Sequence, residues 1–180
     1  NADAIIEHSQ QFDFYDGGGI DIAFLGLGEV DKNGNVNLSK FNGKPVGCGG
    51  AINISQSANK VVFCGTFTTK GLEVEVTEDN KLNIINEGKY NKFVKEVEQV
   101  TFSVKNANFI DQSVYYVTER AVFELTKEGI ELLEIAPGRD LEKDVLAHME
   151  FIPIINDITE MKSGIFNENW GELAKHLAIK

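Results

Sequence analysis

Residues 17–28 read Gly-Gly-Gly-Ile-Asp-Ile-Ala-Phe-Leu-Gly-Leu-Gly, and this stretch decides the fold class. Apart from Asp21, residues 20–27 are apolar, which is typical of a strand buried on both faces of a parallel sheet. Residues 61–64, Val-Val-Phe-Cys, form a second short run of the same kind. The two runs predict two buried strands in an α/β fold.

Alternating patterns around these runs predict antiparallel hairpins. The dipeptide Asn33-Gly34 lies between Val30 and Val36 and is a strong signal for a tight turn. Two further hairpins are predicted over residues 72–85, with one solvated face, and over residues 121–135. Single strands are predicted at 97–104 and 114–118, and residues 92–98 are interpreted as a solvated charged run.

Helices are predicted in only a few places. Residues 3–11 are expected to form one, capped by Asn1, and Asp140 is expected to cap another. Residues 153–180 are expected to be a tail that ends in a short helix at 170–179. The whole pattern is mixed α/β with more strand than helix.

The composition restricts the classes of partner. A chain of 180 residues suits one domain, and 17 basic against 28 acidic residues give a net charge of −11. Such a surface repels phosphate backbones, so no nucleic-acid partner is expected, although backbone amides can still hold one phosphorylated small molecule. No apolar run is long enough for a membrane helix and no signal peptide is evident, so we expect a cytoplasmic protein.

Cysteine and histidine usage predicts no special chemistry. The two cysteines, Cys48 and Cys64, are expected to be buried, reduced thiols. The three histidines have no ligand spacing, so no metal site is expected. A serine nucleophile elbow and a phosphate loop are absent, and Gly26-Leu27-Gly28 is only a partial dinucleotide motif.

Glycine is concentrated in one part of the chain. Ten of the 17 glycines fall between Gly17 and Gly50, and three of them lie in the run Gly47-Cys48-Gly49-Gly50. Such a run can direct consecutive backbone N–H groups at one anion, including the oxyanion of a thioester intermediate. A tight turn between two strands is the alternative interpretation, and spacing alone does not decide between them.

Several motifs, in order, resemble the family I CoA-transferases. The resemblance covers residues 3–152 and is greatest to the single-chain acetate and propionate enzymes, whose C-terminal, β-type half this chain matches. The motifs are FDFYDGGGID (12–21), AFLGL (23–27), VD (30–31), GNVN (34–37), GCGGAIN (47–53), TERAVFEL (118–125) and EIAPG (134–138).

The resemblance implies a fold and an activity. The fold would be an open, mostly parallel sheet with a layer of antiparallel strands, as in NagB/RpiA-like proteins. The activity would move CoA between a short-chain acyl-CoA and a carboxylate, such as acetate, propionate or acetoacetate, through a glutamyl-CoA thioester. CoA would be a substrate, so no cofactor and no metal are expected.

The family's nucleophilic glutamate is not found in this chain. The resemblance places it in a Glu-Ser-Gly or Glu-Asn-Gly motif upstream, whereas Glu7, Glu29 and Glu119 stand in other contexts. We therefore expect a C-terminal fragment (domain 1–152, tail 153–180) that is inactive without its N-terminal half, in a protein that forms homo-oligomers. A non-catalytic assembly domain and an acyl-CoA hydrolase on the same fold remain alternatives.

The resemblance also implies roles for five residues. Gly50 would supply a backbone amide to the oxyanion hole, and Gly49 would shape that turn. Asn37 would lie near the catalytic glutamate and the CoA thiol, and Asn53 stands where relatives often carry aspartate. Lys70 could reach a CoA phosphate, although a solvated lysine is equally compatible with the sequence.

Overall fold

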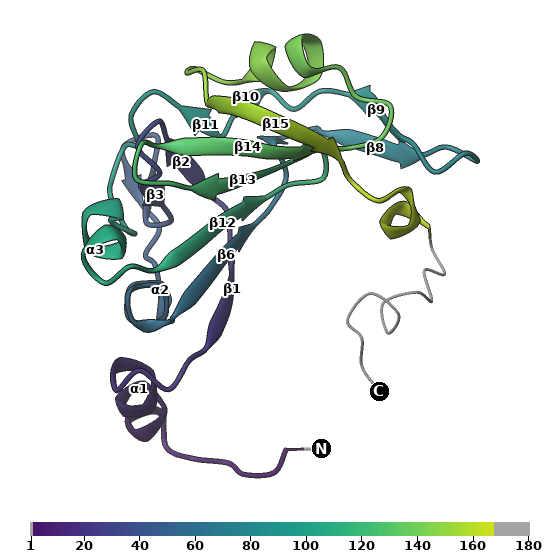
Figure 1. The fold of residues 1–180 in the computed structure, drawn as a ribbon. Coiled ribbons are helices and arrows are strands. Elements are labelled where there is room, and N and C mark those ends of the chain that lie inside the picture. Colours follow the sequence, from purple (N-terminus) through teal and green to yellow (C-terminus); the bar gives the residue numbers. More distant parts are fainter. Residues whose placement is uncertain (1, 168–180) are drawn as a thin grey trace.

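The protein is described by a computed structural model over residues 2–167. Its centre is a six-stranded sheet in the order β1-β6-β12-β13-β14-β15 (Figure 1). The strands are β1 (Ile22–Gly26), β6 (Lys60–Cys64), β12 (Ser113–Val117), β13 (Ala121–Leu125), β14 (Ile130–Ile135) and β15 (Ile154–Glu160). The pairs β1/β6, β6/β12 and β14/β15 are parallel, and β12/β13 and β13/β14 are antiparallel. The predicted mixed, mostly parallel α/β fold is therefore confirmed.

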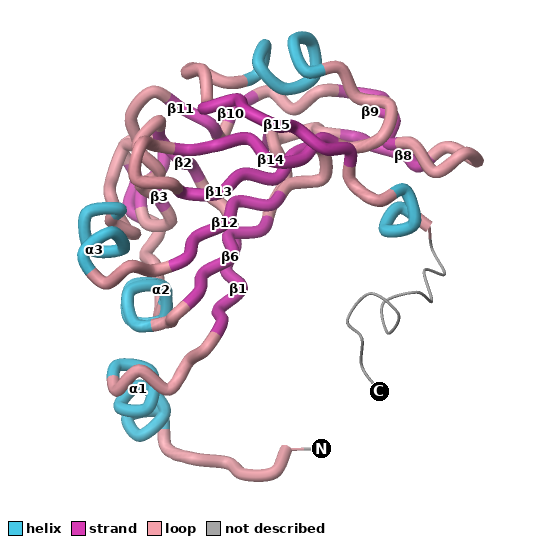
Figure 2. The backbone as a smooth tube through the Cα atoms, in the orientation of Figure 1, coloured by secondary structure: helices cyan, strands magenta, loops and turns pink. Residues whose placement is uncertain are grey.

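One face of this sheet carries the core. Side chains alternate between the two faces of a strand, and on β6 and β12 it is Val61, Phe63, Val114 and Tyr116 that are fully buried. They pack against the small elements on that side of the sheet and against α3 (Val104–Phe109) (Figure 2). The hydroxyl of Tyr116 donates to the carbonyl of the buried turn glycine Gly34 at 2.6 Å.

The small elements form four further sheets. The predicted Asn33-Gly34 hairpin is confirmed as β2 paired antiparallel with β3, and β11 adds to β2 in parallel. The pairs β4/β5, β7/β10 and β8/β9 are antiparallel. The bounds are β2 (Glu29–Asp31), β3 (Val36–Asn37), β4 (Lys40–Phe41), β5 (Lys44–Pro45), β7 (Thr68–Thr69), β8 (Glu73–Val76), β9 (Leu82–Asn86), β10 (Tyr90–Asn91) and β11 (Phe93–Val94).

The hairpin predictions hold with two refinements. The 121–135 hairpin exists, but its strands β13 and β14 lie inside the main sheet. The 72–85 hairpin exists as β8 and β9, but all four residues of β8 are exposed, so both faces of β8 are solvated, whereas Leu82 at the start of β9 is buried. The end of this hairpin projects from the body of the molecule (Figure 1), which explains why Val74 and Val76 are not covered.

Three local predictions about strands and helices are wrong. The first helix, α1, spans His8–Asp16 instead of residues 3–11, because Glu7 and Gln10 form a capping box at its start. Residues 97–104 form no strand and contribute only an isolated bridge between Phe102 and Val36 before α3 begins. Within the predicted tail, Ile154–Glu160 are the edge strand β15, so these residues belong to the sheet.

The helix that Asp140 was predicted to cap is present in a shortened form. The carboxylate of Asp140 accepts a hydrogen bond from the Lys143 amide at 2.9 Å, which confirms the cap. A π-turn, Leu141–Val145, and a 3₁₀-turn, Leu146–His148, follow it. The helix predicted at 170–179 and the cap at Asn1 lie outside the described residues, and the domain boundary at 152 stays a prediction.

Strand β1 is less buried than its sequence suggests. It is an end strand of the sheet, and its Ile22 and Phe24 side chains are 44% and 67% exposed. Cys64, which is opposite Gly26 in the register, is exposed and Cys48 is half-buried, so the prediction of two buried thiols is wrong, although both cysteines are free. Only one face of β1 is therefore covered.

Among residues 2–167, no helix is long and apolar enough to cross a membrane.

Candidate functional site

A cavity of about 680 Å³ opens where β1 ends. The carboxyl ends of parallel strands are where open α/β sheets usually bind ligands, and Leu27 and Gly28 directly follow β1. Most of the other lining residues come from the segments around β4, β7 and β10. They are Glu29, Phe41, Asn42, Thr69, Lys70, Lys89, Tyr90, Asn91, Lys92, Val94 and Glu150.

One wall of this cavity is cationic and aromatic. The ammonium groups of Lys70 and Lys89 lie 5.1 and 5.3 Å from the centre of the Tyr90 ring. The Lys89 amide donates to the Lys70 carbonyl at 3.1 Å, directly beside the paired strands β7 and β10. We call Lys70, Lys89 and Tyr90 the lysine wall. In a chain with a net charge of −11, it is a local surface suited to an anion.

Lys92 faces the same cavity but is already engaged. Its ammonium group donates to the Leu27 carbonyl at 3.0 Å. Burial lowers its pKa, while the nearby Glu119 acts in the opposite direction. The prediction of a solvated run at residues 92–98 is therefore wrong at its first residue, Lys92. The hydrogen bond of Lys92 instead fixes the end of β1 to the segment after β10.

Asn37 is placed behind the cavity rather than at its surface. It is fully buried, and its side-chain amide donates to Glu29 Oε2 at 2.8 Å. Its side-chain oxygen accepts from the amides of Ser39 and Lys40 at 3.0 and 3.1 Å. A Cβ on Gly28 would come within 2.1 Å of the Asn37 carbonyl, so only glycine fits there. In these contacts, Asn37 shapes the cavity floor through Gly28 and Glu29.

The glycine run forms a loop with unpaired amides. We call residues 47–50 the glycine loop. Gly47 and Gly49 have φ angles of 79° and 54°, a region that favours glycine. Within residues 2–167, the amides of Gly49 and Gly50 have no hydrogen-bond acceptor. A Cβ on Gly50 would lie 2.7 Å from Phe12, so α1 covers this position closely.

Asn53 lies one turn beyond the loop, in α2 (Ala51–Ser57). Its side-chain amide donates to both carboxylate oxygens of Asp16, at 2.9 and 3.1 Å. It therefore ties α2 to the end of α1. None of Gly49, Gly50 and Asn53 lines the cavity, and the β4/β5 hairpin, whose Phe41 does, connects the two regions.

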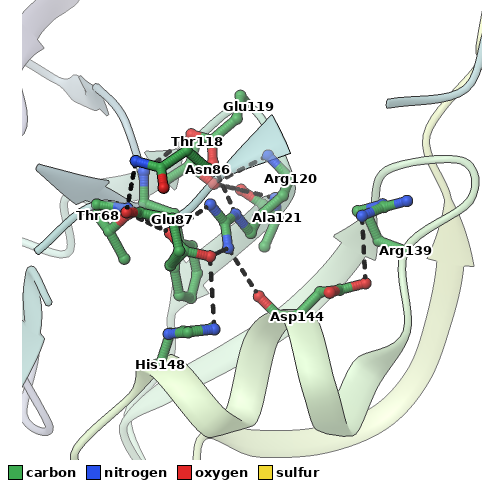
Figure 3. Close-up of polar contacts among 12 residues, drawn as sticks. Thr68, Asn86, Glu87, Thr118, Glu119, Arg120, Ala121, Arg139, Asp144 and His148 are labelled. Atoms are coloured by element: carbon green, nitrogen blue, oxygen red, sulfur yellow. Dashed lines mark hydrogen bonds and ion pairs between the residues drawn. The ribbon is translucent and has the colours of Figure 1, made fainter. Parts of the chain in front are cut away.

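An ion-pair network around the buried Arg120 joins Glu87 and Glu119 (Figure 3). The Arg120 side chain is fully buried and donates to Glu87 at 2.7 and 3.0 Å and to Glu119 at 2.7 Å. Burial opposes the charge of Glu87, but hydrogen bonds from Arg120 and Thr68 lower its pKa to about 2. No local pattern predicts this network, apart from the motif TER (118–120). The segment Lys89-Tyr90-Asn91-Lys92 is basic and aromatic, and this composition is the signal in the sequence that marks the lysine wall.

The described residues hold no group of three or more His, Cys, Asp or Glu side chains that could bind a metal ion. His148, for example, has Glu87 beside it, with its Nε2 3.4 Å from Glu87 Oε2, and no further ligand set.

Searches for similar proteins identify the family. The chain is 51% identical over 156 residues to an acetate CoA-transferase, YdiF, of Escherichia coli K12, and 52% identical over 179 residues to a caffeate CoA-transferase of Acetobacterium woodii. These matches cover 87% and 96% of the chain. The chain belongs to the CoA-transferases. It spans about a third of the length of these relatives, 29% and 34%.

Solved structures agree with this assignment. The chain superposes on the acyl-CoA transferase YdiF of E. coli O157:H7 with a TM-score of 0.90, at 47% identity, covering 93% of this chain and 33% of that one. Glutaconate CoA-transferase from Acidaminococcus fermentans matches with a TM-score of 0.67 at 16% identity, covering 91% of this chain and 63% of that one, and shares the fold alone. A scan against protein-family models found no match.

Proposed function

We propose that this CoA-transferase segment binds the CoA part of an acyl-CoA and forms part of a site that transfers CoA to a carboxylic acid. The observation that carries the proposal is the lysine wall beside a cavity at the carboxyl ends of the strands. CoA is a phosphorylated ligand, and Lys70 and Lys89 are the exposed cations that line this cavity. A charge-assisted hydrogen bond to a phosphate is among the stronger polar contacts in proteins.

In this proposal the lysine wall holds the phosphates of CoA. Lys70 has a φ of 61° and Gly71, which follows it, one of 100°, so the chain turns sharply at the edge of the cavity. Tyr90, which is 40% exposed and whose ring lies beside both ammonium groups, would contact the adenine ring. Gly28 lines the cavity and packs directly against the Asn37 carbonyl, and the narrow pantetheine arm would pass over this floor.

The glycine loop would receive the reacting end of the substrate. The unpaired amides of Gly49 and Gly50 can donate to the oxygen that becomes negative when a thioester carbonyl is attacked. Such preorganised donors stabilise the tetrahedral intermediate more than the ground state, which lowers the barrier. This role uses backbone atoms only, so it is compatible with the positions of Asn37 and Asn53 behind and beside the loop.

The nucleophile would be a glutamate outside these 180 residues. Its carboxylate would attack the acyl-CoA and expel CoA as thiolate, which leaves an acyl-glutamyl anhydride. The thiolate would attack the glutamyl carbonyl, giving a glutamyl-CoA thioester and the free acid, and an incoming carboxylate would reverse both steps. The chain would then be the C-terminal part of the enzyme, completed by an N-terminal half and assembled into a homo-oligomer. No cofactor takes part in these steps.

The acid itself is left open by the relatives, which are named for acetate and for caffeate. Propionate and acetoacetate are further candidates among short carboxylic acids. We propose a cytoplasmic location, because CoA thioesters are the substrates. A hydrolase would use the same glycine loop with water as acceptor, and an assembly domain would use neither the loop nor the lysine wall.

The decisive experiment measures CoA transfer from acetyl-CoA to propionate. This chain and a longer version, extended upstream to include the expected Glu-Ser-Gly or Glu-Asn-Gly motif, are assayed side by side. We expect transfer by the extended protein and none by residues 1–180 alone. Hydrolysis without transfer would favour the hydrolase, and inactivity of the extended protein would favour the assembly domain. Transfer by residues 1–180 would show that a carboxylate within them is the nucleophile.

A further inference from the structure

The buried Arg120 is held by more partners than a stabilising ion pair requires. Its Nε donates to Glu119 at 2.7 Å, and its terminal nitrogens donate to Glu87 at 2.7 and 3.0 Å. One of them also donates to the Asp144 carbonyl at 3.1 Å, and the guanidinium carbon lies 5.0 Å from the centre of the Phe67 ring. Every face of the guanidinium group is therefore in contact, and its position is fixed.

Glu87 connects this fixed group to the chain beside the cavity. While Arg120 binds both of its oxygens, Glu87 Oε1 also accepts from the Gly88 amide at 3.1 Å and from the Thr68 hydroxyl. The same hydroxyl accepts from the Gly88 amide at 3.0 Å. These groups close a ring of hydrogen bonds between the start of β7 and the turn that leads into β10 (Figure 3).

The two strands joined by this ring carry the lysine wall. Thr68 pairs with Asn91 and Thr69 with Tyr90, and Lys70 and Lys89 are the next residues outward on each side. A Cβ on Gly88 would come within 2.5 Å of Thr68 Oγ1 and 2.7 Å of the Thr69 amide, so the strands are as close as they can be. A shift of Glu87 would therefore move both lysines.

We propose that Glu87, anchored by Arg120, is a positioning residue that sets the affinity of the lysine wall for the phosphates of CoA. This inference rests on the proposed function of the cavity but assigns a new role, since neither side chain lines the cavity. Two flexible lysines recognise phosphates tightly only when their backbone is preorganised, because otherwise ordering them on binding costs free energy.

The test measures binding of CoA, and separately of pantetheine, to the extended protein by calorimetry. Glu87→Gln removes the negative charge that Arg120 holds. We expect CoA to bind roughly 10-fold more weakly, because displaced lysines lose part of a charge-assisted hydrogen bond to phosphate, and pantetheine, which lacks the nucleotide phosphates, to bind unchanged. In the transfer assay the same variant should raise KM for acetyl-CoA by a similar factor and leave kcat within about 2-fold.

A second variant avoids leaving Arg120 without its charge partner. Thr68→Val keeps the ion pair and the shape of the side chain but breaks the ring of hydrogen bonds. It should weaken CoA binding in the same selective way, by a smaller factor than Glu87→Gln. Glu128→Gln, in the exposed turn between β13 and β14, is the matched control and should bind CoA as the wild type does.

The outcomes separate the two proposals. Selective loss of CoA binding in a folded Thr68→Val protein supports the positioning role, even where transfer activity is absent and the proposed function fails. Unchanged CoA binding in both variants overturns it, as does an equal loss of CoA and pantetheine binding, which would show a general structural defect. Failure of the wild-type protein to bind CoA also overturns it.

Discussion

The lysine wall and the glycine loop are held in place by different means. The lysine wall rests on a fully buried arginine with two carboxylate partners, and its strands are in direct backbone contact. The glycine loop has unpaired amides, two residues at positive φ and the ring of Phe12 as its close neighbour. The lysine wall, which is expected to bind phosphate, is therefore held in place by its own contacts. The glycine loop, which is expected to stabilise the oxyanion, depends on α1 and on its ligand.

The largest expected effect comes from breaking the anchor of the lysine wall. Arg120→Met leaves Glu87 and Glu119 without their cation, and truncating one partner of a buried pair costs about 3–5 kcal/mol of unfolding free energy. Urea denaturation measures this loss.

Lys40→Met is the matched control for this substitution. Its lysine makes one ion pair, 3.5 Å from Glu98, and both side chains are partly exposed, so the loss should be about 0–1 kcal/mol. Equal losses in the two variants would show that the network around Arg120 is not an anchor.

The next effect concerns the ligand that the wall would bind. Lys70→Met should weaken CoA binding by about 10-fold, because one charge-assisted hydrogen bond to phosphate is lost, and should leave thermal stability unchanged. Titration calorimetry at two salt concentrations checks both points, since the lost contact should also reduce the salt dependence. Lys127→Met, in an exposed turn away from the cavity, is the control. Equal weakening by both substitutions would point to net charge alone.

A substitution in the glycine loop should reduce stability less than Arg120→Met does, but it should selectively reduce catalysis. Gly49→Ala places a side chain at a φ of 54°, which costs about 1–2 kcal/mol. Gly43→Ala, at a φ of 75° in the β4/β5 turn, should cost as much stability. Only Gly49→Ala should lower kcat in the transfer assay, because only that residue belongs to the loop. Equal kcat values would remove the loop from the proposed mechanism.

The smallest effect is a pH dependence of the anchor. The folded protein lowers the pKa of Glu87 from its usual 4.5 to about 2, so this carboxylate stabilises the fold above pH 4.5. The contribution is lost as pH falls towards 2, because the carboxylate is then protonated in both states. The stability difference between wild type and Glu87→Gln should therefore shrink over this window in acid denaturation curves. A constant difference would contradict the ion pair.

The same contrast explains how much of the molecule the sequence could predict. Local patterns were sufficient for β6, for the Asn33-Gly34 turn and for the cap at Asp140, since neighbouring residues determine them. They also marked the run Gly47-Cys48-Gly49-Gly50 as unusual, although they left open whether it is a tight turn or an anion-binding loop. The strand predicted at 97–104 failed because packing of Phe102 and the start of α3 override its β-branched residues.

The anchor of the lysine wall was not predictable in this way. Glu87 and Arg120 are 33 residues apart, and nothing local marks either as buried. The apolar composition of β1 predicts that both of its faces are buried. The strand lies at the end of the sheet, however, and this position, which composition does not determine, leaves Phe24 exposed. The role that the resemblance implies for Asn37 stays a prediction, and the pattern could not show that its side chain is used by Glu29 and Lys40.

We propose above that this chain supplies the lysine wall for CoA, while the nucleophile lies elsewhere in the protein. The most direct test treats the extended protein with acetyl-CoA, digests it rapidly at low pH and locates by mass spectrometry the peptide that carries CoA less one water. We expect a glutamyl-CoA thioester on a peptide outside residues 1–180. A CoA thioester on Glu29, Glu119 or any other carboxylate of these residues would contradict it.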